Sequence, residues 1–547
     1  MASASFSSIP FSSLRFSKLY TDFIGNEGLT ALRFPANQHL FTNATPLKNI
    51  ASANKHRSQI QDAIRETMRG VQLSTAQTSN LAALAESTTL TVMTGQQVGF
   101  LGGALYTMLK AFSAVIAAQK LASTHTELKF VPVFWIEDND HDLEESSVVG
   151  MLNTQGEAYT LRSIFDNVPE RASVADVQYD AAVQASIDEA IQMLPSSEFV
   201  QEVAALLQES YTAGTSLTQA FVRVLHFALA ESGVLLVSAA SLRQRGLFGE
   251  IIAKELENIG VTEEVVAKSS AMLTEFGYHA QAQASAVNAF LHVDGKRHKI
   301  NAERVSATEP RFKAGDKEYT AAELREHCAK HPENFSPAVL LRPVVQDALF
   351  PNAAYIGGPG EIAYLAQIKE LYSFFGVLPT ATLARHSLTI LDNRTAQFLH
   401  KQGMSLDALL RTYDDLEKEV MKSAENQELA ALLEQTRTAI TQAYTALQPL
   451  VAAFDPTLDA STDRTKNQSL QGLDDLAGKI RKAQKRMEET TLGKLRKAHA
   501  FVYPAHVLQE RSLPYLYFAA KFGHSLLAGR LYAVCKEAPT AHFVVEC

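Results

Sequence analysis

One stretch of the chain, residues 89–142, shows in turn the patterns of a strand, a glycine-rich turn, a helix and a second strand. Residues 89–94 are mostly β-branched or apolar and predict a buried strand, and residues 129–136 predict another. The amphipathic run 104–121 between them predicts a helix. Strand, helix and strand in this order form a βαβ unit with parallel strands. Because ligands bind at the carboxyl ends of such strands, we expect the functional site there.

Length and composition limit the class of protein. A chain of 547 residues is too long for one simple core, so we expect two or three domains. The composition, 46% hydrophobic and 20% charged, is that of a soluble globular protein, and the net charge of −9 gives no basis for binding nucleic acid or an anionic membrane. The three cysteines form no CxxC pair, and no apolar run is as long as a membrane span. We therefore expect a cytoplasmic protein with no nucleic-acid or membrane partner.

The rest of the chain predicts a core with two insertions, followed by helices. Largely helical spacing marks a first insertion at about 151–215. Two strand-like runs around Asp294-Gly295, a strong hairpin signal, lie in a second insertion at about 285–335. Apolar residues recur at steps of three and four through 396–500, which predicts a long antiparallel helical hairpin or coiled coil. The aromatic-rich segment 501–547 is too apolar to be a free tail, so we expect it to pack back on the core.

The turn between the first strand and the helix, residues 95–103, is the first candidate site. It matches neither a Walker loop nor a GxGxxG fingerprint, because no GK[ST] follows and the glycine spacing differs. Backbone N–H groups at such a turn favour a phosphate or carboxylate, but glycines also allow close packing, and the pattern leaves both open. Two side-chain amides favour function, since they can bind a carboxylate or an amine. The candidate binding residues are Gly95, Gln96, Gly99, Gly102 and Gly103, and Gln97 is a catalytic candidate.

An acidic cluster after the second strand is the second candidate site. Its members are Asp138, Asp140, His141, Asp142, Glu144 and Glu145. One interpretation is a hard-metal site with oxygen ligands, such as Mg²⁺ accompanying a nucleotide. Another is a general base for an amine, with His141 tuned by neighbouring carboxylates. The structural alternative is an acidic helix N-terminus followed by a solvated loop. With a single histidine and no nearby cysteine, a zinc site is not expected.

Two motifs later in the chain could bind anions. Arg342 could clamp a carboxylate or phosphate, or it could form a buried ion pair with Asp347. The glycine-rich turn 357–361 could form an anion-binding nest, and a plain turn is the structural alternative. The candidate binding residues of the two motifs are Arg342, Gln346, Asp347, Gly357, Gly358, Gly360, Glu361 and Tyr364.

Together these motifs resemble the cysteine-adding enzymes of bacillithiol biosynthesis, a family of cysteine ligases, over essentially the whole chain. The matching segments are Gly95-Gln96-Gln97, Gly102-Gly103, Tyr106-Thr107, Lys110, residues 132–136, Asp140-His141-Asp142, Phe335-Ser336-Pro337, Leu341-Arg342-Pro343, Gln346-Asp347, residues 357–364 and Leu508-Gln509-Glu510-Arg511. One departure is Asn139, which stands where the family usually has Glu. An essential role of that Glu would move to Glu137 or Asp138 in this chain.

The resemblance implies an α/β fold, with a Rossmann-like parallel-sheet core over residues 1–395, two inserted connecting segments and a C-terminal antiparallel coiled coil that forms a homodimer. It implies the last step of bacillithiol synthesis, in which L-cysteine is joined to the amino group of glucosaminyl-malate. ATP is the expected activator of the carboxylate, as an adenylate or an acyl phosphate, so ATP/ADP and Mg²⁺ are the expected cofactors. The catalytic candidates are Asp140, His141, Asp142 and Gln97, and Tyr106 and Lys110 join the binding residues above.

Two other functions remain open at this point. The coiled coil could carry the function of a non-catalytic scaffold whose core binds a nucleotide, or the acidic cluster could serve a metal-dependent hydrolase. The ligase interpretation fails if the turns 95–103 and 357–361 and the side chain of His141 lie on separate faces with no shared cavity.

Overall fold

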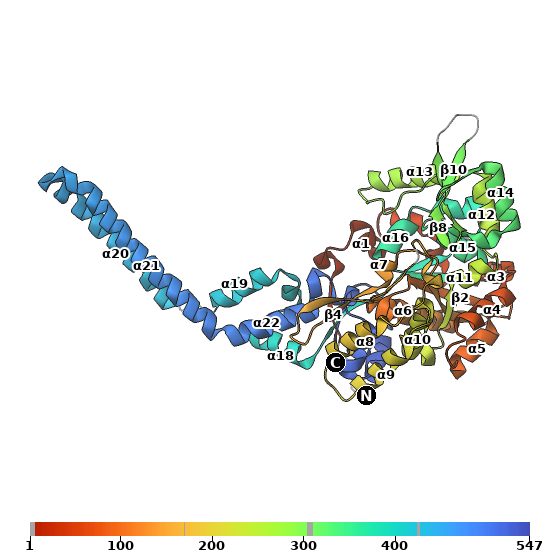
Figure 1. Ribbon diagram of the computed structural model, residues 1–547, viewed down its shortest axis with the longest axis horizontal. Helices are drawn as coiled ribbons and strands as arrows, with labels where there is room; N and C mark the ends of the chain where they lie inside the picture. The colour runs from red at the N-terminus through yellow and green to blue at the C-terminus, as the bar shows by residue number, and fades with distance from the viewer. Residues whose placement is uncertain (1–5, 169, 304–309, 424–426) are drawn as a thin grey trace. The chain divides into compact units, whose positions relative to one another are not determined.

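Figure 1 shows the computed structural model, which describes residues 6–168, 170–303, 310–423 and 427–547. The chain divides into two compact units. The first comprises Met1–Thr154, Ala158–Asn393 and Val507–Cys547, and the second comprises Gln155–Glu157 and Arg394–His506. None of the described helices combines the length and the apolar character that a membrane span needs.

A five-stranded parallel sheet forms the centre of the first unit, in the order β14-β13-β2-β3-β6. Its strands are β2 (Thr89–Gln97), β3 (Lys129–Glu137), β6 (Leu235–Ser238), β13 (Asn352–Gly357) and β14 (Ala381–Ala384). Because both faces are covered, the strands are almost entirely buried, as their apolar and β-branched runs predict. The predicted βαβ unit is therefore confirmed. One detail was wrong, because β2 continues through Gln97 and the glutamines belong to the strand, not to the turn.

Helix α6 (Tyr106–Thr124) is the crossover between β2 and β3. Most of its side chains are buried, since one side covers the sheet and the other is covered by further elements of the same unit. Ala114, Ala117 and Leu121 pack in one cluster with Val92 of β2 and Ile356 of β13. This packing fixes the start of α6 beside the carboxyl ends of the central strands.

The second insertion contains the predicted hairpin. Strands β7 (Ala289–Val293) and β8 (Lys296–Lys299) flank Asp294 and Gly295, whose φ angles of 52° and 74° are both positive, as a type I′ turn requires. Strand β12 (Phe335–Pro337) pairs with β7 and completes a three-stranded sheet. The other elements here are β9 (Asn301–Glu303), β10 (Arg311–Ala314), β11 (Lys317–Thr320), α14 (Ala321–Lys330) and η6 (Pro332–Asn334).

The first insertion is less helical than predicted. Helices α8 (Val183–Met193) and α9 (Val200–Ser210) are present, but β4 (Val148–Leu152) and β5 (Ala158–Arg162) form an antiparallel pair. In β5 only Leu161 is buried, so the strand lacks the apolar alternation that would have revealed it.

The remaining helices of the first unit surround these sheets. They are α1 (Lys18–Gly25), α2 (Thr30–Arg33), α3 (Ala44–Ala53), α4 (Arg57–Thr67), α5 (Thr75–Ala83), α7 (Leu143–Ser146), α10 (Leu217–Leu229), α11 (Ala239–Gln244), α12 (Gly249–Glu257), α13 (Val261–Glu275), α15 (Arg342–Leu349), α16 (Pro359–Leu365), α17 (Lys369–Phe375), α23 (Tyr515–Phe522) and α24 (His524–Val534). The C-terminal strand β16 (His542–Glu546) pairs with β15 (Ser387–Leu391) and β1 (Ser7–Ile9), so the end of the chain is part of this unit.

The second unit consists of helices. Its long members, α20 (Gln427–Phe454) and α21 (Asp459–Met487), pack against one another along their length, which confirms the predicted helical hairpin (Figure 1). Helices α18 (Asn393–Gln402), α19 (Tyr413–Ser423) and α22 (Glu489–Val502) complete the helical region. No residue of α20 or α21 in the described ranges is buried.

Candidate functional site

A cavity of about 340 Å³ lies at the carboxyl ends of β2, β3 and β13, where the fold predicts a ligand site. Its volume is in the range of small-molecule sites. Its lining residues are Gly95, Gln96, Gln97, Tyr106, Lys110, Trp135, Glu137, Asp140, Arg297, Pro337, Val339, Arg342, Tyr355, Gly358, Pro359, Gly360, Glu361, Tyr364, Arg385 and Arg511. The cavity therefore brings together the end of β2, the acidic segment after β3 and the start of α16.

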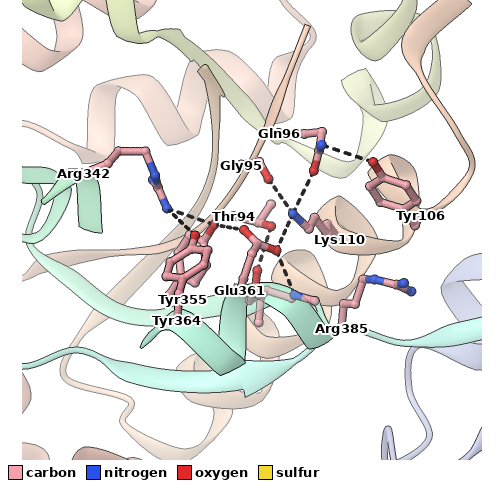
Figure 2. Close-up of polar contacts among 12 residues, drawn as sticks. Thr94, Gly95, Gln96, Tyr106, Lys110, Arg342, Tyr355, Glu361, Tyr364 and Arg385 are labelled. Atoms are coloured by element: carbon pink, nitrogen blue, oxygen red, sulfur yellow. Dashed lines mark hydrogen bonds and ion pairs between the residues drawn. The ribbon is translucent and has the colours of Figure 1, made fainter. Parts of the chain in front are cut away.

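Lys110, from the second turn of α6, lies at the centre of this cavity wall (Figure 2). Its Nζ donates to the carbonyl oxygen of Gly95 at 2.8 Å and to Oε1 of Gln96 at 3.0 Å, and lies 2.5 Å from Oε2 of Glu361. The amide of Gln96 in turn donates to the hydroxyl of Tyr106 at 3.1 Å. Lys110 thus ties the end of β2 to the first turn of α16, two segments far apart in the sequence.

Glu361 receives hydrogen bonds from both sides. The backbone N–H of Gly358 donates to its Oε2 at 2.8 Å, which caps α16, and the hydroxyl of Tyr355 donates to its Oε1 at 2.5 Å. Burial acts to raise the pKa of Glu361, but Lys110 and these donors lower it overall. Burial likewise lowers the pKa of Lys110 while Glu361 opposes that change. The two side chains of this buried pair therefore offset one another's burial through their contact at 2.5 Å.

Arg342 is only 9% exposed, and its guanidinium bonds only neutral groups. It donates to Oε1 of Gln346 at 3.0 Å and to the hydroxyls of Tyr364 at 3.3 Å and Tyr355 at 3.4 Å (Figure 2). No carboxylate oxygen of a described residue lies within 4.0 Å of it, so the ion pair with Asp347 considered above does not form. A buried cation without a counterion at a cavity wall favours an anionic ligand.

Gln346 and Asp347, predicted as binding residues, lie outside the lining of this cavity. Asp347 accepts hydrogen bonds from Asn352 at 2.9 Å, from Tyr372 at 2.8 Å and from the amide of Gln346 at 3.1 Å. The two residues lie behind Arg342 and hold its guanidinium in place, because α15 directs only its first residue at the cavity.

Asp140 is the member of the acidic cluster that reaches the cavity. Its carboxylate accepts from the amide of Gln97 and from Nη1 of Arg297, each at 2.8 Å. Burial acts to raise the pKa of Asp140, but Arg297, the N–H of His141 and Gln97 lower it overall. His141 lies behind Asp140, 3.3 Å from Arg297, and does not line the cavity. Its pKa is lowered by burial and by Arg297, so its imidazole is neutral at pH 7.

The other acidic residues have structural roles. Asp138 is fully buried and points away from the cavity, where it accepts from the hydroxyl of Ser238 at 2.5 Å and the N–H of Ala240 at 2.8 Å. Asp142 caps α7 through the N–H of Glu145 and does not line the cavity, which is the arrangement that an acidic helix N-terminus gives. Within the described ranges, no three His, Cys, Asp or Glu side chains are placed to hold a metal ion.

The glycines of the 99–103 turn serve packing. A Cβ at Gly102 would lie 2.6 Å from Cγ1 of Val224, and one at Gly99 would lie 2.8 Å from the Cα of Gly103. The N–H groups of Gly102 and Gly103 donate within the turn itself, so they offer no cradle to a phosphate. Gly357 lies at the end of β13 and also does not line the cavity. Gly99, Gly102, Gly103 and Gly357 thus lie outside the cavity lining, whereas Gly95, Gly358 and Gly360 line it.

Four charged residues of the cavity were not predicted as binding or catalytic residues: Glu137, Arg297, Arg385 and Arg511. Arg385 donates to Glu510 at 2.7 Å, and both side chains are buried, so this pair is fixed. Arg511 lies 5.8 Å from the ring centre of Tyr106. Glu137 accepts from the indole N–H of Trp135 at 3.0 Å, and burial raises the pKa of its carboxyl. Two of the four had a sequence signal: Glu137, the last residue of β3, as the substitute for a missing Glu at Asn139, and Arg511, as part of the family-like segment Leu508-Gln509-Glu510-Arg511.

Comparison with known proteins identifies the family. Residues 5–386 match the family described as Bacillithiol biosynthesis BshC, N-terminal Rossmann-like domain, and residues 388–547 match its C-terminal coiled-coil domain. Three similar proteins carry the name "Putative cysteine ligase BshC". That of Chlorobaculum tepidum is 32% identical over 91% of this chain and 90% of its own length. That of Prosthecochloris aestuarii is 28% identical over 97% of each chain, and that of Chloroherpeton thalassium is 30% identical over 98% of this chain and 99% of its own. The chain therefore belongs to the BshC family of bacillithiol biosynthesis, with a Rossmann-like domain followed by a coiled-coil domain.

Proposed function

We propose that this protein is a cysteine ligase that joins the carboxyl group of L-cysteine to the amino group of glucosaminyl-malate, the last step of bacillithiol synthesis. The relatives' names support the ligase class. The observation that carries the proposal is the cavity itself, in which the unpaired cation Arg342 faces the same space as the carboxylates of Asp140 and Glu137. Such a site can hold an anionic group and accept a proton from an amine.

Within this proposal Arg342 and Arg511 hold carboxylates of the substrates, because neither has a carboxylate partner within 4.0 Å among the described residues and both line the cavity. The acceptor amine must lose a proton before it attacks, and Asp140 or Glu137 takes it. Gln97 orients Asp140, and Lys110 with Glu361 holds the shape of the wall. His141 supports Asp140 from behind rather than meeting the substrate.

An amide does not form from a free carboxylate in water without activation, and ATP is the proposed activator, which would turn the carboxylate into an adenylate or acyl phosphate. The arginines of the cavity fit an anionic phosphate chain better than the 99–103 turn does, because the N–H groups of Gly102 and Gly103 are bonded within that turn. The carboxylates do not form a protein-held Mg²⁺ site in the described part of the chain. Any Mg²⁺ would be carried by the nucleotide phosphates.

The test is an assay of the purified protein with L-cysteine, glucosaminyl-malate and ATP, with the product read by mass spectrometry. We expect bacillithiol from the natural sequence, and at least a hundredfold loss of kcat/KM in Arg342→Gln, since a charged hydrogen bond to a substrate anion contributes about 3 kcal/mol. Lys401→Gln, on the exposed face of α18, is the matched control and should be fully active. Absence of product with every nucleoside triphosphate would refute the proposal.

The proposal also covers the oligomeric state of the protein, its compartment and its substrates. The protein works as a homodimer formed through α20 and α21, in the cytoplasm, on small-molecule substrates. The exposed leucine side chains of both helices support self-association, since a coiled coil buries such residues.

A further inference from the structure

A second cavity, of about 350 Å³, shares no lining residue with the first. Arg243 of α11 and His292 of β7 line it, together with His327 of α14. Asp176 and the Asp294-Gly295 turn also contribute. The cavity thus lies between helices α11 and α14 and the inserted β12-β7-β8 sheet.

Arg243 is the residue that makes this cavity chemically unusual. It is 7% exposed, and it donates only to neutral oxygens, Oδ1 of Asn139 at 2.8 Å and the carbonyl of Glu333 at 2.6 Å. The carboxylates of Asp176, Asp138 and Glu333 act on it through space, but no carboxylate oxygen of a described residue lies within 4.0 Å. A guanidinium that is buried without a counterion is costly, and the cost falls when an anion binds.

The other buried arginines show how unusual this is. Five arginines are buried among the described residues: Arg33, Arg243, Arg297, Arg342 and Arg385. Arg33, Arg297 and Arg385 each have a carboxylate within 3 Å, from Glu370, Asp140 and Glu510 in that order. The two without one, Arg342 and Arg243, each line a cavity. Arg297 and Arg385 also line the first cavity, but their charges are met by carboxylates of the protein, so Arg342 and Arg243 are the two buried arginines whose charge is left for a ligand.

A polar partition separates the two cavities. Nε2 of His292 lies 2.9 Å from the hydroxyl of Ser336, and Nε of Arg297 donates to the same hydroxyl at 3.3 Å. Arg297 in turn holds Asp140 in the first cavity. Asn139, which bonds Arg243, is the chain neighbour of Asp140. A short series of hydrogen-bonded side chains would therefore connect a ligand on Arg243 with the first cavity.

We propose that the second cavity binds a small molecule bearing a carboxylate, with Arg243 as its counterion. A free amino acid and a hydroxy acid such as malate share this group and fit a cavity of this size. The exposed carboxylate of Asp176 at the same cavity would also accept the ammonium group of an amino acid. This site goes beyond the ligase function proposed above and does not depend on it.

The test is calorimetric titration of the full-length protein with L-alanine, with L-malate and with inorganic phosphate. We expect saturable binding of at least one of the two carboxylates, weakened tenfold or more in Arg243→Gln and retained in Arg342→Gln. The second arginine variant is the matched control, because it removes the unpaired cation of the other cavity. Which of the two carboxylates binds more tightly tells the amino acid from the hydroxy acid.

A second variant keeps Arg243 and tests the same idea. Asn139→Glu places a carboxylate beside the guanidinium, so it should raise the melting temperature and abolish the Arg243-dependent binding. The inference is wrong if neither carboxylate binds, if both bind equally well to Arg243→Gln, or if phosphate alone binds. Ligase assays on the same preparations separate the two proposals, since product formation without Arg243-dependent binding contradicts only this one.

Discussion

At the scale of single residues, the site contrasts a paired cation with an unpaired one. Lys110 is bonded to Glu361 and to a carbonyl, so its charge is used within the protein. Arg342 bonds only neutral groups, so its charge is available to a ligand. The first residue should matter chiefly for stability and the second chiefly for substrate binding.

Lys110→Met should therefore destabilise the fold strongly. The change leaves Glu361 buried without its cation, a loss of about 3–5 kcal/mol. The double variant Lys110→Met/Glu361→Gln should recover part of that loss, because no uncompensated charge remains. Urea unfolding followed by circular dichroism measures both. If the free energy of unfolding of Lys110→Met is within about 1 kcal/mol of that of the natural protein, the pair does not contribute to stability as proposed.

Arg297 should set the acid limit of activity through Asp140. Arg297 is the largest influence that lowers the pKa of this carboxyl, so Arg297→Gln raises that pKa. The carboxylate then protonates at higher pH, and the acid limb of the pH profile of kcat/KM should move to higher pH. The stability that Asp140 contributes is present above its unfolded pKa of about 3.8 and is lost as pH falls through its lower folded value. Lys296→Gln, on the exposed side of the same strand, is the control, and an unmoved limb in Arg297→Gln would contradict this assignment.

At the scale of elements, sequence patterns predicted the elements that long apolar runs or neighbouring turn residues define. The strands β2 and β3, their crossover and the β7–β8 turn follow from runs of apolar residues and from Asp294-Gly295. The pairing of Arg297 with Asp140 could not be predicted, because 157 residues separate them in the sequence. The polar sequence of β8 is also typical of a solvent-exposed strand of a hairpin. A glycine pattern also cannot show whether its N–H groups face a ligand or bond within the turn.

Substitutions at two glycines distinguish a turn that is bonded within itself from one that faces a ligand. Gly102→Ala should cost about 1–3 kcal/mol, because its φ is +86° and the new methyl would meet Val224, yet KM should change little since Gly102 does not line the cavity. Gly360→Ala meets nothing within 4 Å and lies in α16, so stability should be kept while a methyl group enters the cavity wall and raises KM. Thermal unfolding and steady-state kinetics on both variants decide the matter. A large KM effect from Gly102→Ala would restore the phosphate-loop interpretation.

At the scale of the whole molecule, the chain combines an α/β unit that holds both cavities with a helical unit. In the described parts of α20 and α21 no residue is buried, although the two helices pack together. Two packed helices bury too little apolar surface to be stable in isolation, so exposed apolar side chains on them favour a further helical partner.

The prediction at this scale is that α20 and α21 form the dimer contact. Phe454 is 88% exposed and Leu450 is 70% exposed, which is costly for a monomer in water. Leu450→Ser/Phe454→Ser should therefore convert a dimer to a monomer in size-exclusion chromatography with light scattering, with the helical content unchanged. Gln442→Ser, exposed on the same helix, is the control and should remain dimeric. A natural protein that is a monomer at micromolar concentration, or a double variant that stays a dimer, would contradict this prediction. A self-association surface cannot lose its two most exposed apolar side chains on α20 without a change in the monomer–dimer equilibrium. In either case the exposed side chains of this hairpin serve another purpose.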